Sequence, residues 1–466
     1  MRNSLLVLAL VLTACPAEKT ETKPAPATPL APAAAAPAPA RKVTLLITGH
    51  ESGLLPLRAP RLAAQWKAEE HWPDTLAFST GDSFAGEPIS AHFMGASTAE
   101  VMKAMQYKAS ALGNHDLDLG IDTLKTFREA SGVTMLAANL KEKADTDQPL
   151  KLVPSTIVTR EGVKVGVIGF TSVKTVASTV AGRASGLEVT PLDAAVGEAM
   201  KSLEAEKPDV VLALTDDCFV TMQTVLATHA EWKIDLVVGT RCPGEQEFLT
   251  GPTKFFSVGD DLTHYVSAAF ELKADGTKSL NASRKTVATT GAEDADLLAL
   301  RERWQKKLDE DLGQVIGFTK VGFKEDAPQL RTLVATALMD GAKADAALLN
   351  KKGIRAALPK GPITAASVYS IIPFDNAVVT VKVKGEVITK LKTHPEAFML
   401  APSKIDPEKE YVLATTEYIY FGGDGLGLDV VAPDLELTGQ VWQTPVVEWI
   451  KKQGSNEKKP LEKLIK

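Results

Sequence analysis

Short apolar runs alternate with amphipathic stretches along residues 43–292 of this chain. The apolar runs have the length of buried strands, and the stretches between them have the spacing of helices that bury one face. The predicted strands are Val43–Thr48, Thr75–Thr80, Thr134–Ala138, Val163–Phe170, Asp209–Leu214 and Asp235–Val238. The predicted helices are Ala59–Glu70, Thr98–Met105, Leu192–Glu206 and Val220–His229. This alternation requires crossover connections and predicts an α/β fold with largely parallel sheet, whose functional loops lie at the carboxyl ends of the strands.

Polar side chains gather in several of those loops. The densest run is Leu112–Gly120, which contains Asn114, His115, Asp116 and Asp118. An Asn oxygen can bind a metal ion, and a His three residues before an Asp can be oriented by that carboxylate and donate to a phosphoryl oxygen. The sequence therefore predicts a polar site at one edge of the sheets, with Asp82 from an earlier loop as its partner.

The first residues have the pattern of an export signal. A charged start is followed by the apolar run Leu5–Leu12 and by Cys15, which ends a lipobox-like sequence. We expect residues 1–15 to be a lipoprotein signal peptide with Cys15 as the lipidated residue, and residues 16–40, which are mostly Pro and Ala, to form an extended tether. The predicted location is extracytoplasmic and lipid-anchored, at the outer membrane or the periplasmic face.

Length and charge limit the remaining possibilities. A chain of 466 residues is long enough for two or three domains. Its formal charge of -6 argues against a surface for nucleic acid. We expect a domain over residues 41–292, an exposed connecting helix over 293–312 and a second, α+β domain over 313–466. The expected membrane contact is the lipid anchor alone.

Five motifs together resemble the bacterial 5'-nucleotidase family. They are Gly81–Gly86, Gly113–Asp118, Asn350–Arg355, Pro373–Asn376 and Gly422–Gly425, in the family's order. The resemblance covers nearly all of the chain from residue 41 to about residue 450. It implies a four-layer α/β/β/α metallophosphoesterase-like N-terminal domain and an α+β nucleotide-specificity domain of the 5'-nucleotidase C-terminal type.

The resemblance also implies a two-metal centre, and most of its ligand positions are changed here. Asp82 matches the bridging Asp and Asn114 matches the Asn ligand, and they alone keep the family's ligand types. The other three ligand motifs appear as Gly49–Ser52, Thr215–Asp216 and Gly239–Cys242. His50, Asp216 and Cys242 are replacements that can ligate a metal. We therefore expect no dinuclear centre; one altered Zn or Mn site and no metal at all both remain open, and the number of lost ligands favours no metal.

The same resemblance assigns roles to other residues. His115 and Asp118 match the dyad that stabilises the transition state, although Asn and Asp in such a loop also serve to fix a tight turn. In the second domain the matching substrate-binding positions are Asn350, Gly353, Arg355, Phe398, Tyr418 and Asp424. Phe398 and Tyr418 are the expected pair of aromatic rings around a base, and Lys352 stands where the family has glycine.

Two further cysteines, Cys218 and Cys242, follow the ends of two predicted strands that a helix connects, and they lie near each other if those strands are neighbours in the sheet. An oxidising compartment permits a disulfide between them, while buried free thiols and a Cys242 metal thiolate are the alternatives. Three functions remain open for the chain. The first is a lipoprotein that binds a nucleotide or another phosphorylated small molecule, with phosphate-ester hydrolysis weakened or lost. The second is an active metal-dependent 5'-nucleotidase or phosphohydrolase with an altered site, and the third is a structural scaffold.

Overall fold

The computed structural model describes residues 40–70, 75–143, 149–179, 182–229, 231–244, 246–249 and 251–465. The predicted signal segment with Cys15 and the predicted tether up to residue 39 lie outside these ranges. The described residues from Ala40 onward form one compact unit. None of the helices within the described ranges combines the length and the apolar character needed to cross a bilayer.

Two six-stranded sheets form the N-terminal region, residues 41–292. The first has the order β14-β13-β1-β2-β3-β4, with β1 (Arg41–Thr48), β2 (Thr75–Ser79), β3 (Tyr107–Ala111), β4 (Thr134–Leu136), β13 (His264–Leu272) and β14 (Lys278–Thr286). The second has the order β11-β12-β10-β9-β7-β6, with β6 (Ser155–Arg160), β7 (Val163–Phe170), β9 (Val210–Thr215), β10 (Leu236–Gly239), β11 (Glu247–Phe248) and β12 (Lys254–Ser257). Neighbours are parallel from β1 to β4 and from β7 through β9 and β10 to β12.

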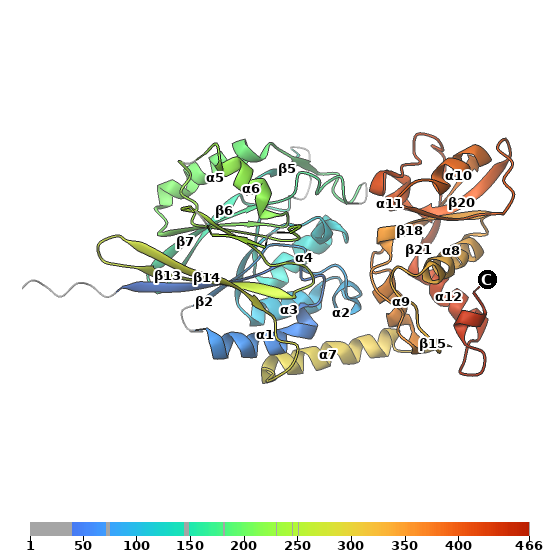
Figure 1. Cartoon of the computed structure of the whole chain (residues 1–466), viewed down its shortest axis with the longest axis horizontal. Coiled ribbons are helices and arrows are strands. Elements are labelled where there is room, and N and C mark those ends of the chain that lie inside the picture. Colours follow the sequence, from blue (N-terminus) through green and yellow to red (C-terminus); the bar gives the residue numbers. More distant parts are fainter. Residues whose placement is uncertain are drawn as a thin grey trace, which may run out of the picture. The chain divides into compact units, whose positions relative to one another are not determined.

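The two sheets pack face to face, and helices cover their outer faces. One core cluster joins apolar side chains of both sheets, including Leu45, Phe78, Val165 and Leu212. The outer face of the first sheet is covered by α1 (Leu55–Glu69), α3 (Ala96–Ala104) and α4 (Ile121–Ser131), and that of the second by α5 (Leu192–Glu206) and α6 (Phe219–Leu226) (Figure 1). The order of layers is α/β/β/α. The short elements α2 (Pro88–Ala91), β5 (Leu140–Glu142) and β8 (Leu187–Val189) lie outside the two sheets.

A long helix, α7 (Ala295–Leu312), leads from the N-terminal to the C-terminal region (Figure 1). The Asp294 side chain caps it by accepting the backbone N–H of Leu297 at 3.1 Å. Near its other end Leu308 and Leu312 pack in an apolar cluster with Ile89 of α2 and Tyr369 of α9 (Ala365–Ile371). The helix therefore contacts both regions along its length.

The C-terminal region is α+β. Its main sheet has the order β19-β16-β20-β18-β21, with β16 (Ala346–Asn350), β18 (Ala377–Lys384), β19 (Ala397–Leu400), β20 (Glu410–Thr416) and β21 (Leu435–Val441). A two-stranded sheet pairs β15 (Val315–Thr319) with β17 (Gly361–Thr364). The remaining helices are α8 (Pro328–Ala342), α10 (Gly385–Lys392), α11 (Glu417–Tyr420) and α12 (Gln443–Gln453).

The predicted strands of the N-terminal region all form, with ends shifted by one or two residues. The antiparallel hairpin of β13 and β14 was not predicted. Alternating exposure along β14, with polar residues such as Lys278, Asn281 and Arg284, leaves no continuous apolar run to mark a strand.

Candidate functional site

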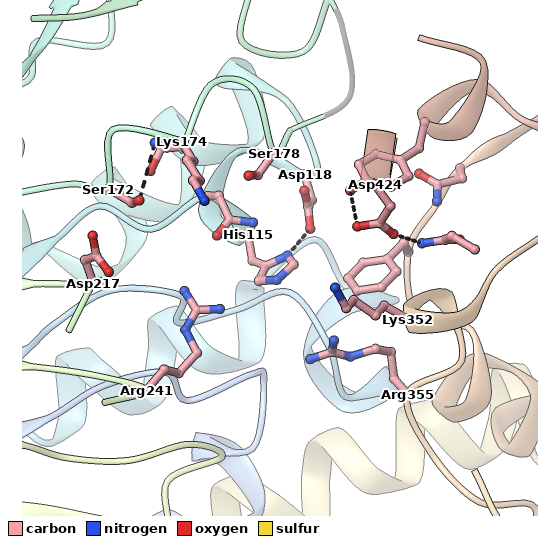
Figure 2. A pocket seen from close by; sticks show the side chains of 16 residues that line it. His115, Asp118, Ser172, Lys174, Ser178, Asp217, Arg241, Lys352, Arg355 and Asp424 are labelled. Carbon is pink, nitrogen blue, oxygen red and sulfur yellow. Dashed lines mark hydrogen bonds and ion pairs between the residues drawn. The ribbon is translucent and has the colours of Figure 1, made fainter. Parts of the chain in front are cut away.

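A cavity of about 320 Å³ is lined by both regions and lies at the carboxyl ends of the N-terminal strands (Figure 2). The N-terminal region contributes Asn114, His115, Asp118, Ser172, Lys174, Thr175, Ser178, Asp217 and Arg241. The C-terminal region contributes Asn350, Lys352, Arg355, Phe374, Asn376, Tyr418 and Asp424. Three of the loops that converge here, which carry Asn114, Asp217 and Arg241, follow strand ends that were predicted to share one edge, whereas the loop with Ser172 and Ser178 was not predicted to take part.

The loop after β3 is held against the loop after β2 by one buried carboxylate. The side chain of Asp116 accepts the backbone N–H groups of Asp82, Ser83 and Gly113 at 2.8–2.9 Å. A Cβ on Gly113 would lie 1.9 Å from Asp82 Oδ1, so only glycine fits between the two loops. Asp116 is thus a structural residue of this site, and it fixes the position of Asp82.

His115 is oriented from two sides. Its Nδ1 lies 2.7 Å from Asp118 Oδ2, and its ring stacks on Phe374 with centroids 5.4 Å apart and planes 14° apart. Burial opposes a charge on the imidazole, but the carboxylates of Asp118 and Asp82 outweigh it and raise the pKa of His115. The structure places the predicted dyad in the cavity wall, where it can hold a proton toward a bound anion.

Asp82 and Asp216 are both buried beside the cavity. Asp82 Oδ1 accepts the backbone N–H of His115 at 2.9 Å, and Asp216 Oδ1 accepts that of Ser172 at 2.9 Å. The Oδ2 atom of each has no hydrogen-bond partner among the described residues. Burial opposes ionisation of Asp82, but His115, His50 and Arg241 outweigh it and lower its pKa. Burial, reinforced by Asp82, raises the pKa of Asp216.

The cation next to this acidic pair is a guanidinium group. Arg241 Nη2 lies 3.4 Å from Asp82 Oδ2 and donates to the backbone carbonyl of Asp216 at 3.3 Å. The Arg241 side chain is 37% exposed and lines the cavity, whereas that of Asp82 is 2% exposed. No role was predicted for Arg241. The signal that could have identified it is its position in the run Gly239–Cys242, directly after a strand, where functional loops of such sheets lie.

The loop that carries Arg241 is fixed to the loop after β9. Cys242 and Cys218 form a disulfide with their Cα atoms 4.7 Å apart. The Thr240 hydroxyl donates to the carbonyl of Asp216 at 2.5 Å, and the Thr240 N–H donates to that of Asp217 at 3.0 Å. Cys242 therefore corrects one prediction: its sulfur is bonded to Cys218 and cannot act as a metal thiolate.

His50 is buried next to this group but does not line the cavity. Its Nδ1 lies 3.0 Å from Ser52 Oγ, and its Nε2 lies 3.9 Å from Asp260 Oδ1. Burial lowers the pKa of His50. Its ring centroid is 6.5 Å from that of His115. Of the predicted ligands His50, Asp82, Asn114 and Asp216, Asn114 lines the cavity and the other three do not.

The metal pair implied by the family does not fit these residues. The charge of Arg241 next to Asp82 repels a divalent cation, and the sulfur of Cys242 is bonded to another cysteine. Across the described ranges of the chain, no three or more His, Cys, Asp or Glu side chains are grouped so as to hold a metal ion. A single site would rest on Asp82 and Asp216 with the Asn114 amide, and the guanidinium already faces one of those carboxylates.

The C-terminal wall is built around Asp424. Asn350 Nδ2 donates to Asp424 Oδ2 at 2.7 Å, and the Tyr418 hydroxyl donates to Asp424 Oδ1 at 3.5 Å. Burial and the nearby Asp424 raise the pKa of Tyr418 to about 12. Gly353 is required because a Cβ there would lie 2.8 Å from the ring of Trp442.

The aromatic pair differs from the predicted one. Phe398 lies on β19, where it is partly buried against the core of the C-terminal region, and it does not line the cavity. Phe374 lines the cavity instead, with the Arg355 guanidinium 5.8 Å from its ring centroid. Phe374 was given no role in the prediction, although it belongs to one of the five motifs. The motif Pro373–Asn376 was the signal that could have identified Phe374.

The comparisons with known proteins agree with the fold. A family model described as the 5'-nucleotidase C-terminal domain matches residues 315–400. The protein UshA of Yersinia enterocolitica is 24% identical over 461 residues, covering 81% of this chain and 83% of UshA. A 5'-nucleotidase of Vibrio cholerae is 25% identical over 368 residues, covering 67% of this chain and 66% of the relative.

A solved structure shows the same fold. The 5'-nucleotidase precursor of Thermus thermophilus superposes with a TM-score of 0.71 at 19% identity, covering 89% of this chain and 97% of that one. The family model thus matches residues 315–400 as a 5'-nucleotidase C-terminal domain, and the relatives and the solved structure show that the chain as a whole is similar to 5'-nucleotidases in sequence and fold.

Proposed function

We propose that the protein binds a nucleotide or another small phosphorylated molecule in the cavity between its two regions, with phosphate-ester hydrolysis weakened or lost. The observation that carries this proposal is the lining of the cavity. Phe374 and Tyr418 offer aromatic faces on which a base can stack, and cationic side chains that suit a phosphate line the same space.

The charges of the lining favour an anion. Lys174 and Arg355 have no carboxylate in ion-pair contact among the described residues, while the acidic groups of the lining are occupied. Asp118 contacts His115, Asp424 accepts from Asn350, and Asp217 accepts the N–H of Cys218 at 2.8 Å. Lys174 and Arg355 are therefore two cations of the lining that a bound anion can pair with.

The loss of hydrolysis is supported by the changed metal ligands. Phosphate monoesters react slowly without strong activation, and the His115–Asp118 dyad alone supplies proton transfer worth about 10²–10⁴-fold. That dyad, with its 2.7 Å contact, nevertheless favours one second candidate, a phosphohydrolase with an altered site. A scaffold without any ligand is the third outcome of the test below.

The test is calorimetric titration of the full-length protein, purified in detergent, with AMP, adenosine, ribose 5-phosphate and inorganic phosphate. Phosphate release from AMP is measured in parallel with Zn, Mn, Co, Ca or Fe added. Saturable AMP binding without phosphate release above the protein-free blank is expected. Stoichiometric metal with turnover that Asp82→Ala abolishes would establish the hydrolase instead, and no heat with any of these compounds would leave the scaffold.

We also propose an extracytoplasmic location with Cys15 as the lipid-bearing residue, on the signal pattern of residues 1–15. Fractionation of cells that express the native chain and the Cys15→Ser variant tests this. The native protein is expected in the membrane fraction and the variant is not. Equal distribution of the two would refute the anchor.

A further inference from the structure

We infer that the guanidinium of Arg241 takes the place of a divalent cation beside Asp82 and Asp216, and that it anchors the phosphate group of the ligand without any metal. This inference rests on the proposed function and specifies how its phosphate is held. It starts from the disagreement between the metal pair that the family implies and the residues that surround the acidic pair.

The buried charge beside the cavity is that of Asp82. Its Oδ2 atom has no hydrogen-bond partner among the described residues, which is costly for a buried carboxylate unless a cation lies near. Arg241 Nη2, 3.4 Å from Asp82 Oδ2, supplies that charge permanently, because a guanidinium does not lose its proton in proteins.

Several hydrogen-bond donors of the Arg241 side chain remain available to a ligand. A guanidinium has five N–H donors in a fixed plane, and the contacts of Arg241 with Asp82 and the Asp216 carbonyl both use Nη2. The rest of the group is partly exposed and lines the cavity. Figure 2 shows the guanidinium turned toward His115 and Lys174, which line the same space. An arginine in this position can donate to phosphate oxygens with two parallel hydrogen bonds.

The loop that carries Arg241 is held in place on both sides of this residue. The backbone of Arg241 has φ 47°, a left-handed conformation that is rare for a residue with a side chain. The disulfide at Cys242 and the two hydrogen bonds of Thr240 hold it there. A donor that is fixed before binding loses little conformational freedom when a ligand binds, so the strained backbone of Arg241 supports a binding role for its side chain.

The same geometry has a simpler explanation, in which Arg241 only neutralises Asp82. That explanation predicts that removing the arginine affects stability and not affinity. Its exposure of 37%, against 2% for Asp82, means that a large part of the side chain is available to a ligand. The experiment has to separate the two effects.

The experiment compares wild-type full-length protein with Arg241→Ala, Arg241→Lys and the control Lys306→Ala, all treated with EDTA. Lys306 is 79% exposed on α7 and does not line the cavity, so its removal changes the net charge and breaks one exposed ion pair, with Glu310, away from the site. Each protein is titrated with inorganic phosphate, AMP and adenosine, and its thermal unfolding is recorded. Wild-type titrations are repeated with added Mn²⁺.

We expect wild-type affinity for phosphate and AMP to be the same within twofold with EDTA and with Mn²⁺. Arg241→Ala should weaken both by about tenfold or more, since it removes charge-assisted hydrogen bonds, and should leave adenosine unchanged. The affinity of Arg241→Lys, which keeps the charge, should lie between those of the wild type and Arg241→Ala. This variant also provides a folded comparison if the alanine variant unfolds. Lys306→Ala should match the wild type.

The outcomes separate this inference from the proposed function. AMP binding that requires Mn²⁺, or that stays equal in the folded Arg241 variants, overturns the inference and leaves the nucleotide proposal standing. A third outcome is that phosphate binding depends on Arg241, but AMP binds no more tightly than phosphate and adenosine does not bind. This outcome supports the inference and removes the nucleotide from the proposed function. Absence of phosphate and AMP binding in wild-type protein overturns both.

Discussion

At the scale of residues, the run Leu112–Gly120 shows how far a motif can be interpreted. His115 and Asp118 face the cavity, as their motif indicated, but Asp116 serves the structure by accepting three backbone N–H groups. Asp116 and Asp118 thus belong to one loop but have different roles, because their side chains contact different parts of the structure. The sequence does not contain that information locally, because Asp82 and Ser83 lie more than thirty residues away.

The role of Tyr418 gives a prediction at this scale. If a base stacks on its ring, Tyr418→Ala should weaken AMP binding by about tenfold, because base–aromatic stacking contributes about 1–3 kcal/mol. Inorganic phosphate, which has no base, should bind as before. Titration calorimetry measures both affinities.

Phe421→Ala provides the control for that variant. Phe421 is 44% exposed, close to Tyr418 in the chain, and it does not line the cavity. Equal AMP affinity in the Tyr418 variant and in this control would show that the ring of Tyr418 takes no part in binding.

At the scale of elements, the loops after β9 and β10 are joined by the Cys218–Cys242 disulfide. The cross-link spans a sequence separation of 24 residues. In the chain-entropy model a loop of this size stabilises the fold by about 3–4 kcal/mol. The double variant Cys218→Ala/Cys242→Ala should lower the free energy of unfolding in urea by about that amount.

Reduction is the matching control for this prediction. With dithiothreitol present, the wild-type protein and the double variant should unfold at nearly the same urea concentration. A double variant as stable as the oxidised wild-type protein would contradict the assignment of a stabilising cross-link to these loops.

The strand pattern allowed the α/β class and the converging loop ends to be predicted, because buried parallel strands appear as continuous apolar runs. The β13–β14 hairpin escaped prediction, since β14 has alternating exposed polar residues. Arg241 escaped for a related reason: its function depends on a contact between two loops, and sequence spacing does not report such contacts.

At the scale of the whole molecule, Arg183 connects the two regions at the cavity. Its Nη1 donates to the carbonyl of Asp118, and its Nη2 donates to the carbonyl of Asp375 at 2.7 Å and lies 3.4 Å from Glu417 Oε1. The five family motifs predicted two regions and their folds. They did not predict this bridge, because Arg183 belongs to none of them.

The bridge leads to a prediction for Arg183→Ala. AMP needs both walls of the cavity, so its affinity should fall by about tenfold when the arginine is lost, through removal of hydrogen bonds that involve a charged group. Inorganic phosphate contacts the Arg241 side of the cavity and should change less than twofold. Titrations with both ligands measure this difference, and an equal loss for the two would show that Arg183 does not act through the relative placement of the walls.

The central claim is that this protein, which is similar to 5'-nucleotidases, binds a phosphorylated ligand at a site where arginine replaces metal. The most direct measurement is the titration of EDTA-treated full-length protein with AMP, with phosphate release recorded on the same sample. The account predicts saturable binding that Arg241→Ala weakens, and no phosphate release. Binding or turnover that appears only after a divalent metal is added would contradict it.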